Sequence, residues 1–173
     1  KTERYAELVA GGGSPLRPGI ARLLDEAIAA GLKVGIASTT TSANVAALLD
    51  AELGKGAHRR FAVMACGDAV PAKKPAPDIY RLALSALGLG PWQAVAFEDS
   101  ANGLASAKAA GLFTVVTPTR WTQSQDFGEA DLTLSSLGDP SRPLEGEDAR
   151  RAGGPFLTLA GLAALHARTR ATA

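Results

Sequence analysis

Three short polar stretches in this sequence each follow an apolar run and carry residues that could bind a phosphate group or a metal ion. The first contains Ser38 and Thr39, directly after the apolar residues 34–37. A hydroxyl and exposed backbone N–H groups between a strand and the start of a helix suit an anion. An ordinary helix cap is the alternative, and it is the better explanation when this stretch is taken alone.

A lysine pair, Lys73-Lys74, forms the second stretch and precedes Pro75. Proline restricts the backbone just before an expected helix, so the ammonium group of Lys74 has a defined position. A positioned ammonium could neutralise a phosphate. The alternative is a solvated lysine pair in a loop, which is the usual situation of lysines.

Two neighbouring carboxylates, Glu98 and Asp99, form the third stretch at the end of the apolar residues 94–97. Paired acids at the end of a buried strand suit a hard cation such as Mg²⁺, which prefers oxygen ligands and retains some of its water. Asp99 or Ser100 could instead cap the following helix, and neighbouring residues can fill both roles. Together, the three stretches could hold a phosphate against Mg²⁺.

Short apolar runs alternate with helical patterns along the chain, which predicts an α/β, Rossmann-like fold with a parallel sheet and helices on both faces. The expected strands cover residues 33–38, 61–66, 94–97 and 113–117, with a weaker fifth at 131–134. The expected helices run from Ile20 toward Gly31, from a cap at Thr41 or Ser42, over residues 78–87 and over residues 100–110. Because ligands bind at the carboxyl ends of strands in such sheets, we expect Ser38, Lys74 and Asp99 at one edge.

The bulk properties of the chain narrow its possible partners. Its 173 residues suffice for one domain, and a net charge of +1 gives no reason to expect nucleic acid or a membrane surface as a partner. No apolar run is long enough to span a bilayer. The single cysteine, Cys66, lies in an apolar run, so we expect it to be buried and the protein to be cytoplasmic.

Composition shifts divide the chain into four parts. Residues 17–137 are expected to form the core α/β domain, and residues 1–16 the end of a cap or a linker. Residues 138–155 are polar and rich in proline and glycine, so we expect a loop. Residues 156–173 are expected to form a last helix that packs on the core.

The residues around the three stretches resemble the haloacid dehalogenase superfamily. Ser38 is similar to its second motif, Lys74 to its third and Glu98-Asp99 to its fourth. The segments 74–80 (Lys-Pro-Ala-Pro-Asp-Ile-Tyr) and 97–104 (Phe-Glu-Asp-Ser-Ala-Asn-Gly-Leu) resemble the branch that contains CbbY and β-phosphoglucomutase. Residues 15–19, 36–41 and 117–122 look like CbbY rather than phosphoglucomutase, and the resemblance covers nearly the whole chain.

This resemblance implies a Mg²⁺-dependent sugar-phosphate phosphatase, monomeric when intact, that works through an aspartyl phosphate. Xylulose 1,5-bisphosphate is the substrate that the CbbY resemblance implies. Ser38 and Thr39 would bind the phosphoryl group, and Lys74 would neutralise its charge and orient the nucleophile. Asp99 would bind Mg²⁺, with Glu98 as a direct or water-mediated ligand. A β-phosphoglucomutase-like phosphotransferase and a catalytically inactive binding protein remain alternatives.

The nucleophile motif is where the sequence departs from the family pattern. In the family, Asp-x-Asp-Gly-Thr ends the first strand, whereas these 173 residues contain no Asp-x-Asp. We therefore expect a fragment that cannot form the aspartyl phosphate by itself. The family's first strand lies between the strands expected near residues 34–38 and 94–98. We expect an open slot between those two strands, and a polypeptide of marginal stability.

Overall fold

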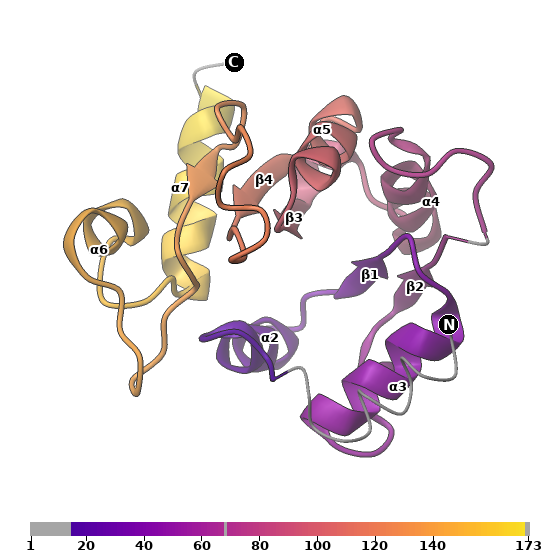
Figure 1. The fold of residues 1–173 in the computed structure, drawn as a ribbon, viewed down its shortest axis with the longest axis horizontal. Coiled ribbons are helices and arrows are strands. Elements are labelled where there is room, and N and C mark those ends of the chain that lie inside the picture. The colour runs from indigo at the N-terminus through magenta and orange to yellow at the C-terminus, as the bar shows by residue number, and fades with distance from the viewer. Residues whose placement is uncertain (1–14, 68, 172–173) are drawn as a thin grey trace.

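Two sheets, each built of parallel strands, lie at the centre of the computed structural model, which describes residues 15–67 and 69–171 (Figure 1). One sheet has the order β1-β2 and the other β3-β4-β5. The strands are β1 (Gly35–Ala37), β2 (Val63–Ala65), β3 (Val95–Glu98), β4 (Phe113–Val116) and β5 (Leu132–Thr133). In register, Gly35 pairs with Val63, Val95 with Phe113 and Val115 with Leu132. The predicted parallel α/β architecture is confirmed.

The helices begin and end at local signals in the sequence. They are α2 (Ile20–Ala29), α3 (Ser42–Leu53), α4 (Asp78–Leu87), α5 (Ala101–Ala109), α6 (Gly146–Ala152) and α7 (Leu159–Ala171), with 3₁₀ turns η1 (Ala57–Arg60) and η2 (Pro91–Gln93). The Thr41 side chain accepts a hydrogen bond from the backbone N–H of Asn44 and caps α3. α4 ends at Gly88, which has a left-handed φ of 67° that glycine adopts without steric cost.

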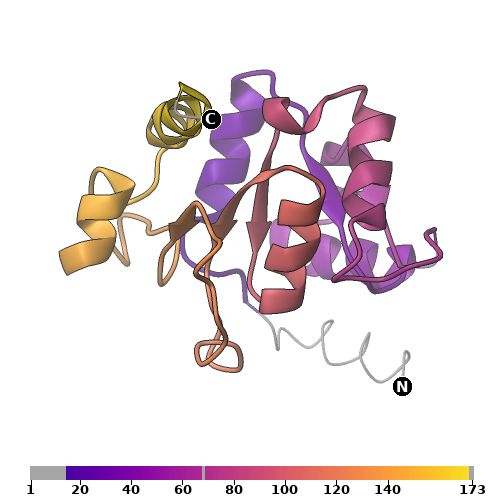
Figure 2. The same ribbon diagram turned by 90° about the horizontal axis from the view of Figure 1, so that it is seen from above.

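Apolar clusters attach the helices to both faces of the sheets. α3 packs Val45 and Leu49 against Cys66 after β2, and Cys66 is buried as expected. On the other side, α4 and α5 pack against Ala96 of β3. Figure 2 shows α5 and α7 on opposite sides of the second sheet. The cluster beneath α7 also takes Leu23 from α2, so residues from both ends of the described chain share one core.

A gap separates β1 from β3, the inner strands of the two sheets. Ser38 N donates to Ala65 O at 2.9 Å, and Thr117 N donates to Glu98 O at 2.8 Å, so each inner strand bonds on its outer side. No ladder joins β1 to β3 in the part of the chain that the structure describes. The expected separation of these two strands is therefore present, whereas marginal stability stays a prediction.

Several boundaries differ from those expected from the sequence. β1 and β2 have three residues each, shorter than the apolar runs that contain them. The stretch expected as a polar loop contains α6, because acids in its first turn and arginines in its last turn match the helix dipole. α7 begins at Leu159 rather than at residue 156. The expectation for residues 1–16 falls almost entirely outside the described residues.

None of the described helices combines the length and the apolar character that a membrane crossing requires.

Candidate active site

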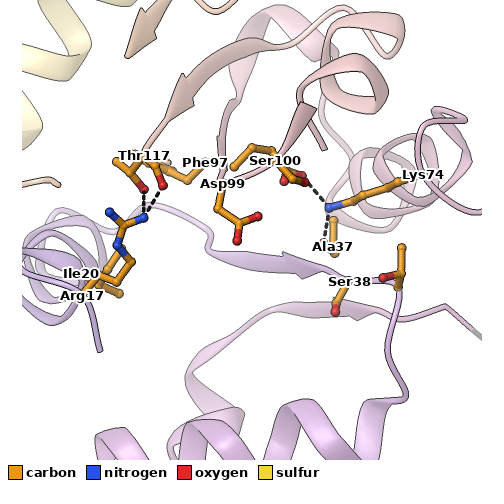
Figure 3. A pocket seen from close by; sticks show the side chains of 11 residues that line it. Arg17, Ile20, Ala37, Ser38, Lys74, Phe97, Asp99, Ser100 and Thr117 are labelled. Carbon is orange, nitrogen blue, oxygen red and sulfur yellow. Dashed lines mark hydrogen bonds and ion pairs between the residues drawn. The ribbon is translucent and has the colours of Figure 1, made fainter. Parts of the chain in front are cut away.

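A pocket of about 410 Å³ lies between the carboxyl ends of β1 and β3 (Figure 3). β1 leads into Ser38 and Thr39, β3 ends at Glu98 just before Asp99, and Lys74 reaches in from the segment before α4. The lining residues are Arg17, Ile20, Ala37, Ser38, Thr39, Lys74, Phe97, Glu98, Asp99, Ser100 and Thr117. All five residues singled out as site candidates from the sequence therefore border one space.

The turn after β1 is held against the segment that follows β2. Ser38 Oγ accepts a hydrogen bond from Thr40 N at 3.3 Å, and Gly67 N donates to Thr40 O at 3.0 Å. A Cβ at Gly67 would lie 2.1 Å from Thr39 O, so only glycine permits this close approach. The turn thereby presents a hydroxyl and backbone groups to the pocket from a fixed position.

Lys74 connects the two sheets. Its Nζ donates to Ala37 O of β1 at 2.9 Å and to Glu98 Oε1 of β3 at 2.5 Å (Figure 3). The ammonium also lies 4.9 Å from the ring centroid of Tyr80. An ammonium has three N–H donors, so one donor of Lys74 remains for a ligand in the pocket.

The carboxylate of Glu98 is buried and faces the protein interior. Besides Lys74, the Tyr80 hydroxyl donates to Glu98 Oε1. Burial raises the pKa of Tyr80 above its usual value, and the negative charge of Glu98 adds to this effect, so the hydroxyl stays a donor. On the other side, a Cβ at Gly103 would lie 1.8 Å from Glu98 Oε2. The expected role of Glu98 as a metal ligand therefore competes with two strong internal contacts.

Asp99, in contrast, directs its carboxylate into the space between Arg17 and Lys74 (Figure 3). Among the described residues, no hydrogen-bond donor contacts this carboxylate. No group of three or more His, Cys, Asp or Glu side chains with metal-binding geometry occurs in the described ranges. That donor set still fits Mg²⁺, because Mg²⁺ is commonly held by one or two carboxylates together with water and phosphate oxygens.

Arg17 lies at the opposite end of the pocket, and no site role was expected for it from the sequence. Its guanidinium donates to the carbonyl and hydroxyl of Thr117, and to Pro118 O at 2.9 Å and Ser135 O at 2.6 Å. Burial lowers the pKa of Arg17 below its usual value, and the charge of Asp99 partly offsets this shift. Arg17 thus ties the segment before α2 to the ends of β4 and β5.

Tyr80 and Gly103 also shape the site without having been singled out from the sequence. Tyr80 is the last residue of segment 74–80, and Gly103 lies in segment 97–104; these are the two segments whose sequences resemble the family. The usable signal was Gly103, because a glycine inside a helical pattern costs stability and so suggests a packing reason for its presence. No local signal pairs Tyr80 with Glu98.

The haloacid dehalogenase-like hydrolase family matches residues 1–111 of the chain, so the protein belongs to that family. Within it, the relatives place the chain in the CbbY branch, as the motifs predicted. Protein CbbY encoded on a plasmid of Cupriavidus necator is 52% identical over 144 residues, which are 83% of this chain and 57% of that protein.

Solved structures agree with this placement. CbbY from Rhodobacter sphaeroides in complex with phosphate is 46% identical, with a TM-score of 0.80, and the match covers 94% of this chain and 65% of that one. A mutant of CbbY from the same organism, in complex with xylulose 1,5-bisphosphate, is 49% identical, with a TM-score of 0.76 and coverage of 81% and 64%. The chain thus spans less than two thirds of the length of each of these proteins.

Proposed function

We propose that this pocket binds the phosphoryl group of a sugar phosphate together with Mg²⁺, as part of a CbbY-like phosphatase whose substrate is xylulose 1,5-bisphosphate. The observation that carries the proposal is that Ser38, Lys74 and Asp99, from three separate segments, line one pocket. The substrate is supported by similarity to a CbbY protein that was solved with this bisphosphate.

Ser38 and Lys74 would act on the phosphoryl oxygens. The Ser38 hydroxyl and the backbone N–H groups near Thr39 can donate hydrogen bonds, and the free donor of Lys74 can add a charge-assisted one. Because Lys74 is also bonded to Ala37 O and Glu98, its ammonium is already oriented before a ligand arrives. Preorganised donors of this kind stabilise negative charge as it develops in the transition state.

Asp99 would supply the anionic oxygen for Mg²⁺, and its exposure to the pocket favours it over the enclosed Glu98. When bound there, Mg²⁺ would offset the negative charge of the phosphoryl oxygens. Glu98 would then act mainly by holding Lys74 in place. The covalent step requires a nucleophilic carboxylate, and the 173 residues contain no Asp-x-Asp. We therefore propose that this polypeptide alone binds phosphate and Mg²⁺ without turnover.

The test compares the 173-residue polypeptide with the product of the complete open reading frame that encodes it. We expect the complete product to contain an Asp-x-Asp motif and to release phosphate from xylulose 1,5-bisphosphate in the presence of Mg²⁺. Asp99→Asn and Lys74→Ala should each lower that rate at least about 100-fold, because each removes charge that stabilises the transition state. The 173-residue polypeptide should release none.

Lys33→Ala is the matched control for the lysine variant. Lys33 is exposed and donates to Leu87 O at 2.7 Å, away from the pocket, so its loss should leave the rate unchanged. The proposal fails if the complete product lacks Asp-x-Asp or does not act on the bisphosphate. It also fails if the 173-residue polypeptide shows turnover that Asp99→Asn abolishes.

A further inference from the structure

We propose that Thr122 and Gln125, in the loop after β4, are positioning residues that hold Asp99 in the orientation needed to bind Mg²⁺. This inference rests on the proposed function, because it assumes that Asp99 is the metal ligand. Neither residue lines the pocket, so any effect on metal binding must be indirect, through the segment that contains Asp99.

Thr122 holds the backbone of Asp99 directly. Its Oγ1 donates to Asp99 O at 2.5 Å and accepts from Thr119 N at 2.8 Å. A threonine hydroxyl has one proton, and the N–H of Thr119 uses a lone pair of the oxygen. The hydroxyl also lies 3.1 Å from Thr119 Oγ1 and 3.5 Å from Thr119 O. The much shorter contact with Asp99 O assigns the single proton to the carbonyl of Asp99.

Gln125 holds the residue that follows the Asp99-Ser100 pair. Its Oε1 accepts from Ala101 N at 2.8 Å. Ala101 is the first residue of α5, where backbone N–H groups have no partner within the helix. One loop thus contacts the chain on both sides of Ser100.

The loop is itself well enough bonded to serve as a support. Thr122 N and Gln123 N both donate to Thr119 O, at 3.0 and 2.9 Å, and Gln125 N donates to Thr122 O at 2.9 Å. These bonds close consecutive turns within a few residues. The two contacts to the Asp99 segment therefore come from one local unit.

The backbone has to orient Asp99, because no described residue donates a hydrogen bond to its carboxylate. On the strand side, Glu98 O is already held by Thr117 N at 2.8 Å. Among the described residues, Thr122 alone bonds the carbonyl of Asp99, so without Thr122 this peptide would have no hydrogen-bond partner before α5. Mg²⁺ demands near-ideal ligand geometry, and losing groups that orient a metal ligand typically reduces metal affinity about 10-fold or more.

The experiment follows the amide signals of the 173-residue polypeptide by two-dimensional ¹⁵N NMR during titration with MgCl₂ in the presence of inorganic phosphate. Thr122→Val keeps the shape of the side chain and removes the hydroxyl, and we expect it to weaken Mg²⁺ binding about 10-fold. Thr122→Ser restores the hydroxyl and should recover most of the affinity. A role limited to packing of the loop would not produce this recovery.

Two further variants keep the test decisive. Gln125→Met removes the second tie at an exposed position and should weaken Mg²⁺ binding by a few-fold, even if Thr122→Val does not fold. Thr158→Val is the control, because its Oγ1 accepts from Gly161 N at 3.0 Å at the start of α7, far from Asp99 in sequence and in the fold. Its Mg²⁺ affinity should equal that of the unaltered polypeptide.

The outcomes separate this inference from the proposed function. If Asp99→Asn leaves Mg²⁺ binding unchanged, the proposed metal site and the inference fail together. If Asp99→Asn abolishes binding while Thr122→Val and Gln125→Met, or the folded one of the two, bind as tightly as the unaltered polypeptide, the inference alone is overturned. It is also overturned if Thr122→Ser binds as weakly as Thr122→Val.

Discussion

The two sheets contribute to the same pocket but differ in how well they are enclosed. All four residues of β4 are buried, and β4 is paired on both sides. β1 pairs only with β2, its Gly35 is exposed, and its other two residues are half-buried. The second sheet thus resembles a complete core, whereas the first depends on helices α3 and α4 for its position.

The difference shows that the pocket joins a more buried part of the molecule to a less buried one. Asp99 follows β3, which pairs with the buried β4, and Ser38 follows β1. Lys74 is bonded to both, through Ala37 O and Glu98. The relative placement of the phosphate donors and the metal ligand should therefore depend strongly on this one side chain.

Removing the Lys74 ammonium should have the largest effect on stability. The side chains of Lys74 and Glu98 are 13% and 6% exposed, and leaving one member of a buried ion pair unpaired costs about 3–5 kcal/mol. We expect Lys74→Met to lower the free energy of unfolding in urea by that amount. The exposed Lys33→Met should change it by less than about 0.5 kcal/mol. A loss below about 1 kcal/mol for Lys74→Met would show that the pair does not join the sheets.

Native-state hydrogen exchange should show the difference between the sheets without any mutation. Amides buried and paired within β4 open only with large-scale unfolding, whereas those of a sheet with an exposed edge open locally. We expect the amides of β4 to exchange at least about 10-fold more slowly than the hydrogen-bonded amides of β1 and β2. This ratio corresponds to a difference of about 1.4 kcal/mol in the free energy of opening. Equal protection in both sheets would contradict the comparison.

A smaller effect, confined to the first sheet and its helices, is the pH dependence of the stability that the Asp50–His58 contact contributes. The hydrogen bond from His58 lowers the pKa of Asp50 on α3 from 3.8 to about 2. Because the folded-state pKa is below the ordinary value, this contact stabilises the fold above about pH 4 and is lost as the pH falls through about 2. Asp50→Asn should therefore lower the Tm near neutral pH, and the difference should shrink as the solution is acidified.

Glu52→Gln, on the same helix, serves as the control for that measurement. It also neutralises one carboxylate of α3 but leaves the Asp50–His58 contact intact. Its Tm should follow that of the unaltered polypeptide across the whole pH range. An Asp50→Asn difference that stays constant with pH would mean that the charge of Asp50 does not contribute.

Features that depend on neighbouring residues were predictable from the sequence. The bounds of α4 agree with the expected helix over residues 78–87, and Thr41 is the cap of α3, because periodicity and capping act within a few residues. The parallel class followed from the alternation of strands and helices. Strand lengths did not, because β1 and β2 end where their pairing ends rather than where their apolar runs end.

Contacts between distant segments could not be predicted in the same way. Arg17 bonds to Thr117, 100 residues away, and nothing within five residues of Arg17 indicates that partner. Likewise, the adjacency of Glu98 and Asp99 suggested that the two act together. The structure instead directs Glu98, the last residue of β3, toward Lys74 and Tyr80, whereas Asp99, which follows the strand, points toward the pocket.

If the two sheets form one phosphate and metal site, a crystal structure of the 173-residue polypeptide grown with MnCl₂ and inorganic phosphate should contain both ligands there. Mn²⁺ stands in for Mg²⁺ and is located by its anomalous scattering. We predict a phosphate within hydrogen-bonding distance of Ser38 Oγ and Lys74 Nζ, and Mn²⁺ on the carboxylate of Asp99. Phosphate bound away from Ser38 and Lys74, or Mn²⁺ bound without Asp99, would mean that the two sheets do not form this site.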